Sequence, residues 1–239
     1  MYPWGQYPIS RELPLPGPWF RYVTPTCLVQ ATGDQCSTAM AVPAPSLPLA
    51  LPLADATKPA LRQAALARRK VAANTAAGSA VAFHFLGGIE LPAGATVAGY
   101  IPMGDELDVM PLLVTLAARG HPLALPVVVP GQPTLTFRSW TGGAPLEPGA
   151  RGTRHPPASA PAVTPQVLLV PLLAVDDDGF RLGYGKGYYD LTIQALRAAG
   201  PLLAVGVGYA AQRVDRLPRD PWDAALDALV CDDGVRHFA

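Results

Sequence analysis

The chain has 239 residues, of which 50% are hydrophobic and 15% are charged, and its formal net charge at pH 7 is zero. This length is enough for one sizeable domain or two small ones with a hydrophobic core. The neutral charge argues against a general binder of nucleic acid or of membrane surfaces, because such binding depends on clustered positive charge, and no apolar run approaches the roughly 18 residues of a membrane span.

Residues 1–54 are predicted to form a disordered or loosely packed extension. Ten of the 28 prolines fall within residues 1–57, and segments such as 13–18 can propagate neither a helix nor a central strand. A secretory signal is not expected, because Arg11 is the only basic residue near the start and prolines interrupt the apolar stretch 47–53.

The folded domain, residues 55–239, is predicted to begin with a helix. Thr57 is suited to cap this helix and Pro59 to occupy its first turn, and an Ala-rich helical pattern continues to Ala73. A second helical segment is expected over residues 80–86.

Strand and helix patterns alternate through the rest of the domain. Periodic apolar residues predict a helix over 106–119 that ends at Gly120, and its apolar face comprises Leu107, Met110, Val114 and Ala117. Residues 142–165 are expected to be mostly loop. Six strands are expected, over residues 96–101, 123–129, 134–140, 167–173, 202–207 and 228–231. The alternation predicts a single α/β domain of three α/β/α layers around a mostly parallel sheet.

In sheets of this kind, ligands bind beyond the carboxyl ends of the strands. Two segments leave strands at that edge: residues 102–106, and the glycine-rich segment 178–190, which reads Asp-Gly-Phe-Arg-Leu-Gly-Tyr-Gly-Lys-Gly-Tyr-Tyr-Asp. Gly183, Gly185 and Gly187 alternate, so bare N–H groups can converge on an anion at the start of the helix predicted to follow.

Charged residues in the same segment favour phosphate chemistry. Arg181 and Lys186 supply two positive charges, and Asp190, in the first turn of the following helix, can hold a hydrated Mg²⁺ beside a phosphate. Together these groups are what phosphoryl transfer requires. The plainer alternative is a glycine-rich turn with two solvated cations.

The segment is neither of two common phosphate-binding motifs. A Walker A loop needs Ser or Thr after its Gly-Lys pair, whereas here Gly187 and then Tyr188 follow Lys186. The dinucleotide fingerprint needs its third glycine at position 188.

The string Arg-Leu-Gly-Tyr-Gly-Lys-Gly-Tyr-Tyr-Asp resembles the signature of the 5-formyltetrahydrofolate cyclo-ligase (methenyltetrahydrofolate synthetase) family. The resemblance runs from about Lys58 to the C-terminus and includes the stretches 58–62, 100–106, 206–212 and 223–227. This sequence departs from the family pattern in its long N-terminal extension and at His155, which stands where members often have a glutamate. We interpret His155 as an ordinary surface histidine.

The resemblance implies a role for each matching residue. ATP binding falls on Lys58, Arg62, Arg181, Leu182, Gly183, Tyr184, Gly185, Lys186, Gly187, Tyr188 and Tyr189, with Lys186 and Arg181 acting in catalysis. Folate binding falls on Ile101, Glu106, Tyr184, Gly185, Lys186, Gly187 and Tyr188, and Mg²⁺ binding on Asp190 and Asp223.

Plainer interpretations remain open for three of these stretches. Lys58 and Arg62 are also consistent with a solvated basic turn of the first helix. Asp105 and Glu106 are consistent with a cap on the helix that follows, and Asp223 with one half of a polar i, i+4 pair with Asp227. For the stretch 102–106 two roles are compatible, with Asp105 as the cap and Glu106 facing the ligand.

The fold implied by the resemblance is a Rossmann-like sheet of the NagB/RpiA/CoA transferase-like kind. The implied reaction is the ATP- and Mg²⁺-dependent cyclisation of 5-formyltetrahydrofolate to 5,10-methenyltetrahydrofolate, with release of ADP and phosphate, in one-carbon metabolism. Its partners would be ATP and a reduced folate, without nucleic acid or membrane, and a monomer is expected. Two alternatives stay open: an ATP-dependent ligase or kinase with another acceptor, and a non-catalytic folate-binding paralogue.

The cysteines favour a cytoplasmic protein. Cys27, Cys36 and Cys231 are odd in number and lack metal-binding spacing, which is typical of free thiols in a reducing compartment.

Overall fold

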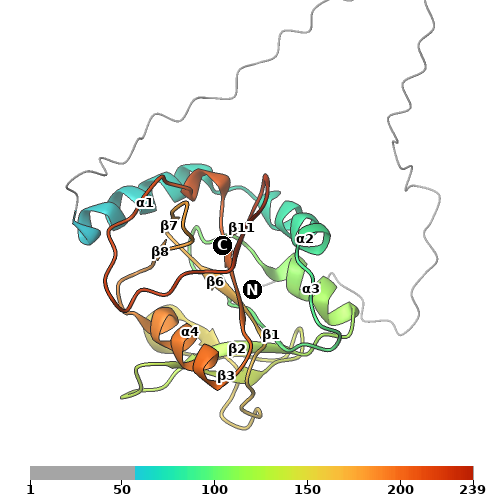
Figure 1. The fold of residues 1–239 in the computed structure, drawn as a ribbon. Coiled ribbons are helices and arrows are strands. Elements are labelled where there is room, and N and C mark those ends of the chain that lie inside the picture. Colours follow the sequence, from blue (N-terminus) through green and yellow to red (C-terminus); the bar gives the residue numbers. More distant parts are fainter. Residues whose placement is uncertain (1–56, 239) are drawn as a thin grey trace, which may run out of the picture. The chain divides into compact units, whose positions relative to one another are not determined.

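The computed structural model describes residues 57–238, so the predicted extension over residues 1–54 lies outside the described residues. Their centre is a seven-stranded sheet in the order β11-β10-β9-β6-β1-β2-β3 (Figure 1). Its strands are β1 (Val97–Ala98), β2 (Leu123–Val128), β3 (Leu135–Ser139), β6 (Val167–Pro171), β9 (Leu203–Val207), β10 (Ala228–Cys231) and β11 (Gly234–His237).

The central strands of the sheet, from β10 to β2, run parallel. The two edge strands are antiparallel, β3 to β2 and β11 to β10. The prediction of a mostly parallel α/β sheet is therefore confirmed. The finer NagB/RpiA assignment stays a prediction.

Helices cover both faces of the sheet (Figure 1). They are α1 (Lys58–Ala72), α2 (Ala77–Gly88), α3 (Met110–Ala118) and α4 (Tyr188–Ala199). Helix α2 packs on α3 and on strands β10 and β11. On the opposite face, Ile193 of α4 joins a buried core with Leu168 and Val170 of β6. Helix α1 packs against the 3-10 turn Ala210–Gln212 that follows β9.

Helix α1 begins where the sequence predicts. Thr57 takes the N-cap position and Pro59 lies in the first turn, although the Thr57 side chain makes no capping hydrogen bond. The residues that α1 buries are Leu61, Ala65 and Arg69, which are spaced four apart and so lie on one face. An arginine on this buried face is a departure from an apolar stripe.

Helix α3 begins four residues later than predicted. It starts at Met110 with Pro111 in its first turn, and the Oδ1 atom of Asp108 accepts the Met110 N–H at 2.9 Å. Asp105 therefore lies in the preceding turn and does not cap the helix. The predicted face is also partly wrong, because Ala117 is exposed and Val114 only half-buried, whereas α3 buries Met110, Leu112, Leu113 and Leu116.

Short strands account for most of the other differences. Strand β1 is only two residues long. The Gly99 N–H still donates to the Ala124 carbonyl of β2 at 3.0 Å, and any side chain at Gly99 would meet Leu113 of α3. Strand β10 is not the last strand, because the chain reverses and adds β11. The loop-rich region 142–165 contains the small hairpin of β4 (Glu147–Pro148) and β5 (Arg154–His155) with a 3-10 turn at Ala150–Gly152.

A second small hairpin, which was not predicted, leads into the glycine-rich segment. It consists of β7 (Ala174–Val175) and β8 (Arg181–Leu182). The turn between them is held by buried Asp176, whose Oδ1 atom accepts the N–H groups of Asp178 and Phe180 at 3.1 and 2.9 Å. The glycine-rich segment therefore starts from a hairpin fixed to the core, not directly from the long buried strand.

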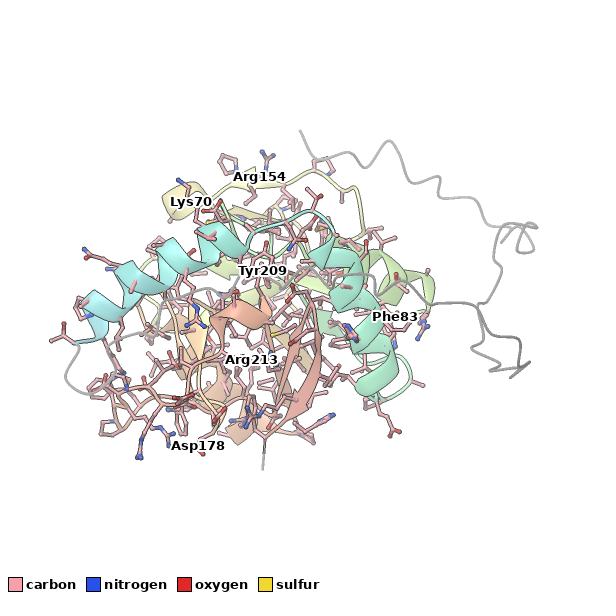
Figure 2. All side chains as sticks on the ribbon, turned by 90° about the horizontal axis from the view of Figure 1, so that it is seen from above. Lys70, Phe83, Arg154, Asp178, Tyr209 and Arg213 are labelled. Atoms are coloured by element: carbon pink, nitrogen blue, oxygen red, sulfur yellow. The ribbon has the colours of Figure 1, made fainter. Side chains whose placement is uncertain are left out.

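The outer surfaces of α1 and α2 carry both charged and apolar side chains. Figure 2 shows Lys70 on α1 and Phe83 on α2, and both are exposed, Phe83 to 75%. None of the helices within residues 57–238 has both the length and the apolar character needed to cross a membrane.

Candidate active site

The glycine-rich segment connects β8 to the start of α4. Gly185 and Gly187 have φ angles of +89° and +70°, a region in which a residue with a side chain is strained, and Gly187 is the N-cap of α4. The unpaired N–H groups of the first helical turn and the positive end of the helix dipole therefore lie at this segment. Such an arrangement favours a bound anion.

Two cations lie at the glycines of this segment, Arg62 and Lys186. From α1, the Nε atom of Arg62 donates a hydrogen bond to the carbonyl of Gly183 at 3.0 Å. The Arg62 guanidinium also occupies the space that a side chain at Gly185 would need, because a Cβ there would lie 2.8 Å from Cζ of Arg62. Lys186 is exposed and has no hydrogen bond or ion pair with any other residue between 57 and 238.

Arg181, at the β8 end of the same segment, is buried instead of exposed. Only 4% of its side chain is exposed, and its Nη2 atom lies 3.1 Å from Oδ2 of Asp190. Its guanidinium also stacks over the Tyr189 ring at 5.5 Å. The structure thus brings two predicted site residues together as a buried ion pair, in which the charge of Arg181 is already balanced by Asp190.

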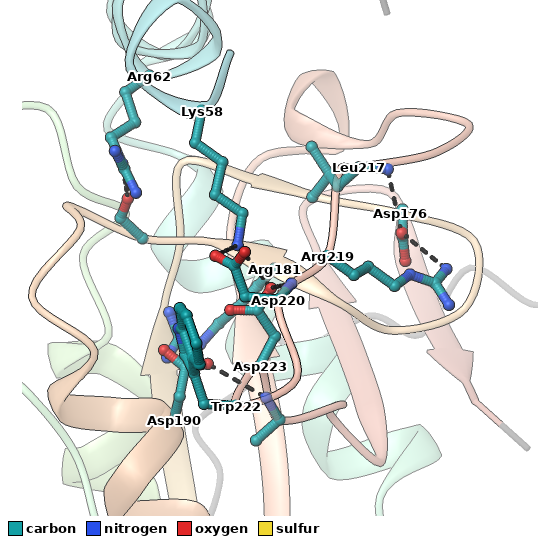
Figure 3. Close-up of polar contacts among 12 residues, drawn as sticks. Lys58, Arg62, Asp176, Arg181, Asp190, Leu217, Arg219, Asp220, Trp222 and Asp223 are labelled. Carbon is teal, nitrogen blue, oxygen red and sulfur yellow. Dashed lines mark hydrogen bonds and ion pairs between the residues drawn. The ribbon is translucent and has the colours of Figure 1, made fainter. Parts of the chain in front are cut away.

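A second group of charged residues connects α1 to the C-terminal region (Figure 3). The Nζ atom of Lys58 contacts carboxylate oxygens of both Asp220 and Asp223 at 2.6 Å. Burial lowers the pKa of Lys58, but its hydrogen bonds and charge interactions with the two aspartates outweigh this and raise the pKa above its ordinary value. Lys58 and Asp223, predicted separately for ATP and Mg²⁺, are therefore direct partners.

A hydrogen bond from the backbone brings the two predicted metal ligands, Asp190 and Asp223, close together. The Ala224 N–H donates to Oδ1 of Asp190 at 3.4 Å, one residue after Asp223. No cluster of three or more Asp, Glu, His or Cys side chains suited to a metal occurs among residues 57–238. A metal held here would take its remaining ligands from phosphate and water oxygens, which is how Mg²⁺ is usually bound. The donor set therefore fits Mg²⁺ once phosphate is present.

Asp227, the predicted i, i+4 partner of Asp223, has a separate structural role. Its Oδ1 atom pairs with Arg197 of α4 at 2.8 Å, and its Oδ2 atom accepts the Ala204 N–H at 2.6 Å. His155 lies in β5, with its Nδ1 atom 2.8 Å from the Pro156 carbonyl oxygen. We therefore assign structural contacts, and no ligand, to Asp227 and His155.

On the other side of the glycine-rich segment lies the turn that carries Glu106. This residue is 8% exposed, and its Oε2 atom accepts the Met103 N–H at 2.9 Å. Burial raises the pKa of Glu106, and the Met103 N–H, the charge of Arg69 and Tyr184 partly oppose that rise. Ile101, the other predicted folate contact, is half-buried just before this turn.

Tyr184 connects the two sides of the site. It is 48% exposed, and its hydroxyl accepts a hydrogen bond from Nη2 of Arg69 at 2.8 Å. Nη1 of Arg69 in turn lies 3.8 Å from Oε1 of Glu106. The carboxylate predicted to bind folate and the segment predicted to bind phosphate therefore meet at one place. Tyr188 is half-buried in the first turn of α4.

Two charged residues of this site were not predicted from the sequence. Arg69 gave one signal, since it follows Leu61 and Ala65 at helical spacing on a face that is otherwise apolar. Asp220 gave none, because its only distinguishing feature is its contact with Lys58. Two shallow hollows of about 320 and 370 Å³ lie elsewhere, beside β3 and between the end of α2 and β9, and no predicted site residue lines either.

Comparison with known proteins shows which family and which proteins this chain is similar to. A family model described as the 5-formyltetrahydrofolate cyclo-ligase family matches residues 54–232. A 5-formyltetrahydrofolate cyclo-ligase of Mycolicibacterium smegmatis is 35% identical over 188 residues, covering 71% of this chain and 91% of the relative. One of Haemophilus influenzae is 31% identical over 174 residues, covering 68% of this chain and 92% of the relative.

Solved structures are similar over the same region. The NMR structure of Aquifex aeolicus 5,10-methenyltetrahydrofolate synthetase superposes with a TM-score of 0.60 at 30% identity, covering 75% of this chain and 92% of that one. A 5,10-methenyltetrahydrofolate synthetase from Mycoplasma pneumoniae gives a TM-score of 0.58 at 25% identity, covering 74% and 99%.

Proposed function

The chain belongs to the 5-formyltetrahydrofolate cyclo-ligase family, and we propose that it converts 5-formyltetrahydrofolate to 5,10-methenyltetrahydrofolate, using ATP with Mg²⁺ and releasing ADP and phosphate. The observation that carries this proposal is the contact of Tyr184 with Arg69, next to Glu106. It joins an anion-binding helix start to a buried carboxylate, so one site has a place for a triphosphate and a place for a pterin.

The chemical problem is that the oxygen of a formamide is a poor leaving group. Transfer of the γ-phosphoryl group from ATP to this oxygen releases ADP and makes the oxygen a good leaving group. Nitrogen 10 of the folate then attacks the formyl carbon, and loss of phosphate and of the proton on nitrogen 10 completes the ring. No covalent bond to the protein is required, so catalysis consists of alignment and charge stabilisation.

The residues of the site divide this work. Lys186, exposed and without a partner among the described residues, is free to bind the transferring phosphoryl group, and Arg62 lies against the same segment. The N–H groups at the start of α4 bind phosphate oxygens. Arg181 acts by fixing Asp190. On the folate side, the free Oε1 atom of Glu106 accepts N–H groups of the aminopterin edge.

Mg²⁺ would be held by Asp190 and Asp223, and when bound it neutralises charge on the phosphates. In this structure the Lys58 ammonium donates a hydrogen bond to the Asp223 carboxylate. We propose that the ammonium moves from Asp223 to the nucleotide phosphates when ATP binds. Lys58 would then act in ATP binding, as the resemblance implies.

We further propose a cytoplasmic monomer. Cys231 is buried and free, and burial raises its pKa to about 12. It is therefore an unreactive thiol, consistent with a reducing compartment.

The test is the near-UV absorbance of the methenyl product, followed with and without ATP and Mg²⁺. Lys186→Met keeps the stem but removes the charge, and we expect it to fold normally and to turn over roughly 10²- to 10³-fold more slowly, the scale for loss of one preorganised electrostatic donor. Lys70→Met is the matched control, because Lys70 is equally exposed but lies on α1 and has no partner within residues 57–238.

The proposal has two distinct ways to fail. Absence of the methenyl product from the parent protein would reject the reaction and favour another acceptor or a binding role, which ADP release with other carboxamides would separate. A folded Lys186→Met variant that is as fast as Lys70→Met at saturating ATP and Mg²⁺ would reject the role of Lys186 alone.

A further inference from the structure

Arg69 is a buried cation on α1 to which the proposed reaction gives no direct role. It is 3% exposed, and its Nε and Nη1 atoms have no hydrogen-bond partner among residues 57–238. Burying a charge that is incompletely paired is costly. An apolar residue would continue the face of Leu61 and Ala65 at less cost, so the stability of α1 does not explain the arginine.

The contacts that Arg69 does make all lead to the site. Its Nη2 atom donates to the Tyr184 hydroxyl at 2.8 Å, and its guanidinium lies 5.6 Å from the centre of the Tyr184 ring. Its Nη1 atom lies 3.8 Å from Oε1 of Glu106. Arg69 thus joins three segments that are distant in sequence: α1, the turn after β1 and the glycine-rich segment.

We propose that Arg69 is a positioning residue, which holds Glu106 and Tyr184 together and keeps the Glu106 carboxylate ready to accept N–H groups from the pterin. The proposal rests on the proposed function, because it concerns the folate side of the same site. Arg69 acts through Glu106, whose Oε1 atom has no hydrogen-bond partner in the described part of the chain and can accept one from a ligand.

The groups around Glu106 show why a cation is needed there. Burial raises the pKa of Glu106, and the phenols of Tyr100 and Tyr189, which also face it, are themselves held neutral by burial, which raises their pKa values. The charge of Arg69, the Met103 N–H and Tyr184 oppose the rise for Glu106.

Loss of the Arg69 charge would therefore raise the pKa of Glu106 further. The protonated acid would then persist to higher pH, and its O–H would donate where the pterin also donates. Folate binding would fail in a pH range where the parent protein still binds.

The experiment compares Arg69→Met with Arg68→Met, its neighbour on α1. Among residues 57–238, the Arg68 guanidinium donates a hydrogen bond only to the Arg213 carbonyl, at 3.2 Å. KM for 5-formyltetrahydrofolate and for ATP is measured across pH. For Arg69→Met we expect the folate KM to rise by about tenfold to a hundredfold, the range for one charge-assisted contact, while the ATP KM changes far less. The acidic limb of kcat/KM for folate should move to higher pH. Arg68→Met should behave as the parent protein does.

A double-mutant cycle separates positioning from a structural role. If Arg69 acts through Glu106, Arg69→Met should add little to the folate KM in a Glu106→Gln background. Fully additive effects, equal losses for folate and ATP, or an unmoved acidic limb would overturn the proposal.

The experiment distinguishes failure of this proposal from misfolding of the variant and from failure of the proposed function. Should Arg69→Met fail to fold, Arg69→Gln, which removes the charge but keeps a polar, planar end, decides the matter: a selective rise in folate KM supports positioning, and parental values reject it. If the parent protein makes no methenyl product, the proposed function fails first, and the same variants are compared by equilibrium binding of 5-formyltetrahydrofolate.

Discussion

Substitution of Gly185 by alanine tests how the glycine-rich segment and α1 cooperate. Two effects are expected at this position. The backbone has a φ angle of +89°, and a Cβ would lie 2.8 Å from Cζ of Arg62. The first effect strains the backbone, whereas the second displaces a cation that is otherwise fixed by its hydrogen bond to the Gly183 carbonyl at 3.0 Å.

The two effects have different magnitudes and different readouts. A left-handed conformation costs an alanine about 1–2 kcal/mol, which for a domain of this size corresponds to a fall in Tm of about 2–8 °C. Arg62 is a flexible, half-buried side chain, so moving it adds little to the free energy of unfolding. Its displacement should instead weaken ATP binding about tenfold or more, since a hydrogen bond to a charged group contributes about 1.5–3 kcal/mol.

The matched control is Gly131→Ala. Gly131 has a φ angle of +80° and open space around its Cβ position, and it lies in the loop before β3, away from the site. Both variants should lose similar Tm in a thermal melt, but only Gly185→Ala should raise the ATP KM. In an Arg62→Ala background, Gly185→Ala should then change the ATP KM little, unless the new methyl group itself obstructs the nucleotide.

The interpretation would be refuted by a Gly185→Ala protein that loses Tm as Gly131→Ala does and keeps the parental ATP KM. In that case the guanidinium of Arg62 would be free to move without consequence for the nucleotide.

Four further changes give expected outcomes. Glu106→Gln should weaken folate binding by about 1–3 kcal/mol with little effect on ATP binding. Because burial raises the pKa of Glu106, the parent protein should lose folate affinity as pH falls through that raised pKa. The Gln variant should show no such pH-dependent loss. Asp190→Asn should raise the Mg²⁺ concentration needed for turnover and also lower Tm, since it leaves buried Arg181 unpaired. Asp223→Asn should raise the Mg²⁺ requirement with a smaller change in Tm, and equal Mg²⁺ titrations would reject the metal role of either residue. Deletion of residues 1–54 should leave Tm and turnover close to those of the full chain, because the family model matches from residue 54; a several-fold loss of turnover would show that the extension contributes.

The elements predicted correctly are those with a strong local cause. Thr57 and Pro59 mark the start of α1, and apolar runs predict the central strands. The start of α3 was predicted wrongly, because Asp108 competes with Asp105 as the side chain that accepts a helix N–H. Strand β11 was missed, since it is stabilised by pairing with β10 more than by its own four residues.

The site was predictable only where one segment held several functional residues. The glycine-rich segment carries its own signal in the spacing of its glycines and its two cations. The partners of these residues lie far away in sequence: Arg69 is 115 residues from Tyr184, and Lys58 is 162 residues from Asp220. Neither pairing leaves a trace in local composition, because the fold alone brings the side chains together.

The hydrogen bonds of Lys58 with Asp220 and Asp223 also have a consequence for the time at which the site is completed during protein synthesis. Lys58 is in the first turn of the first described helix, and its two carboxylate partners follow it by 162 and 165 residues. A ribosome adding about 5–20 residues per second needs roughly 8–33 seconds between these points. For that time the growing chain carries an ammonium without its partners, and the glycine-rich segment is itself made only shortly before Asp220 and Asp223. On the proposed function, a nascent chain therefore completes its nucleotide site only after Asp220 and Asp223 have been made.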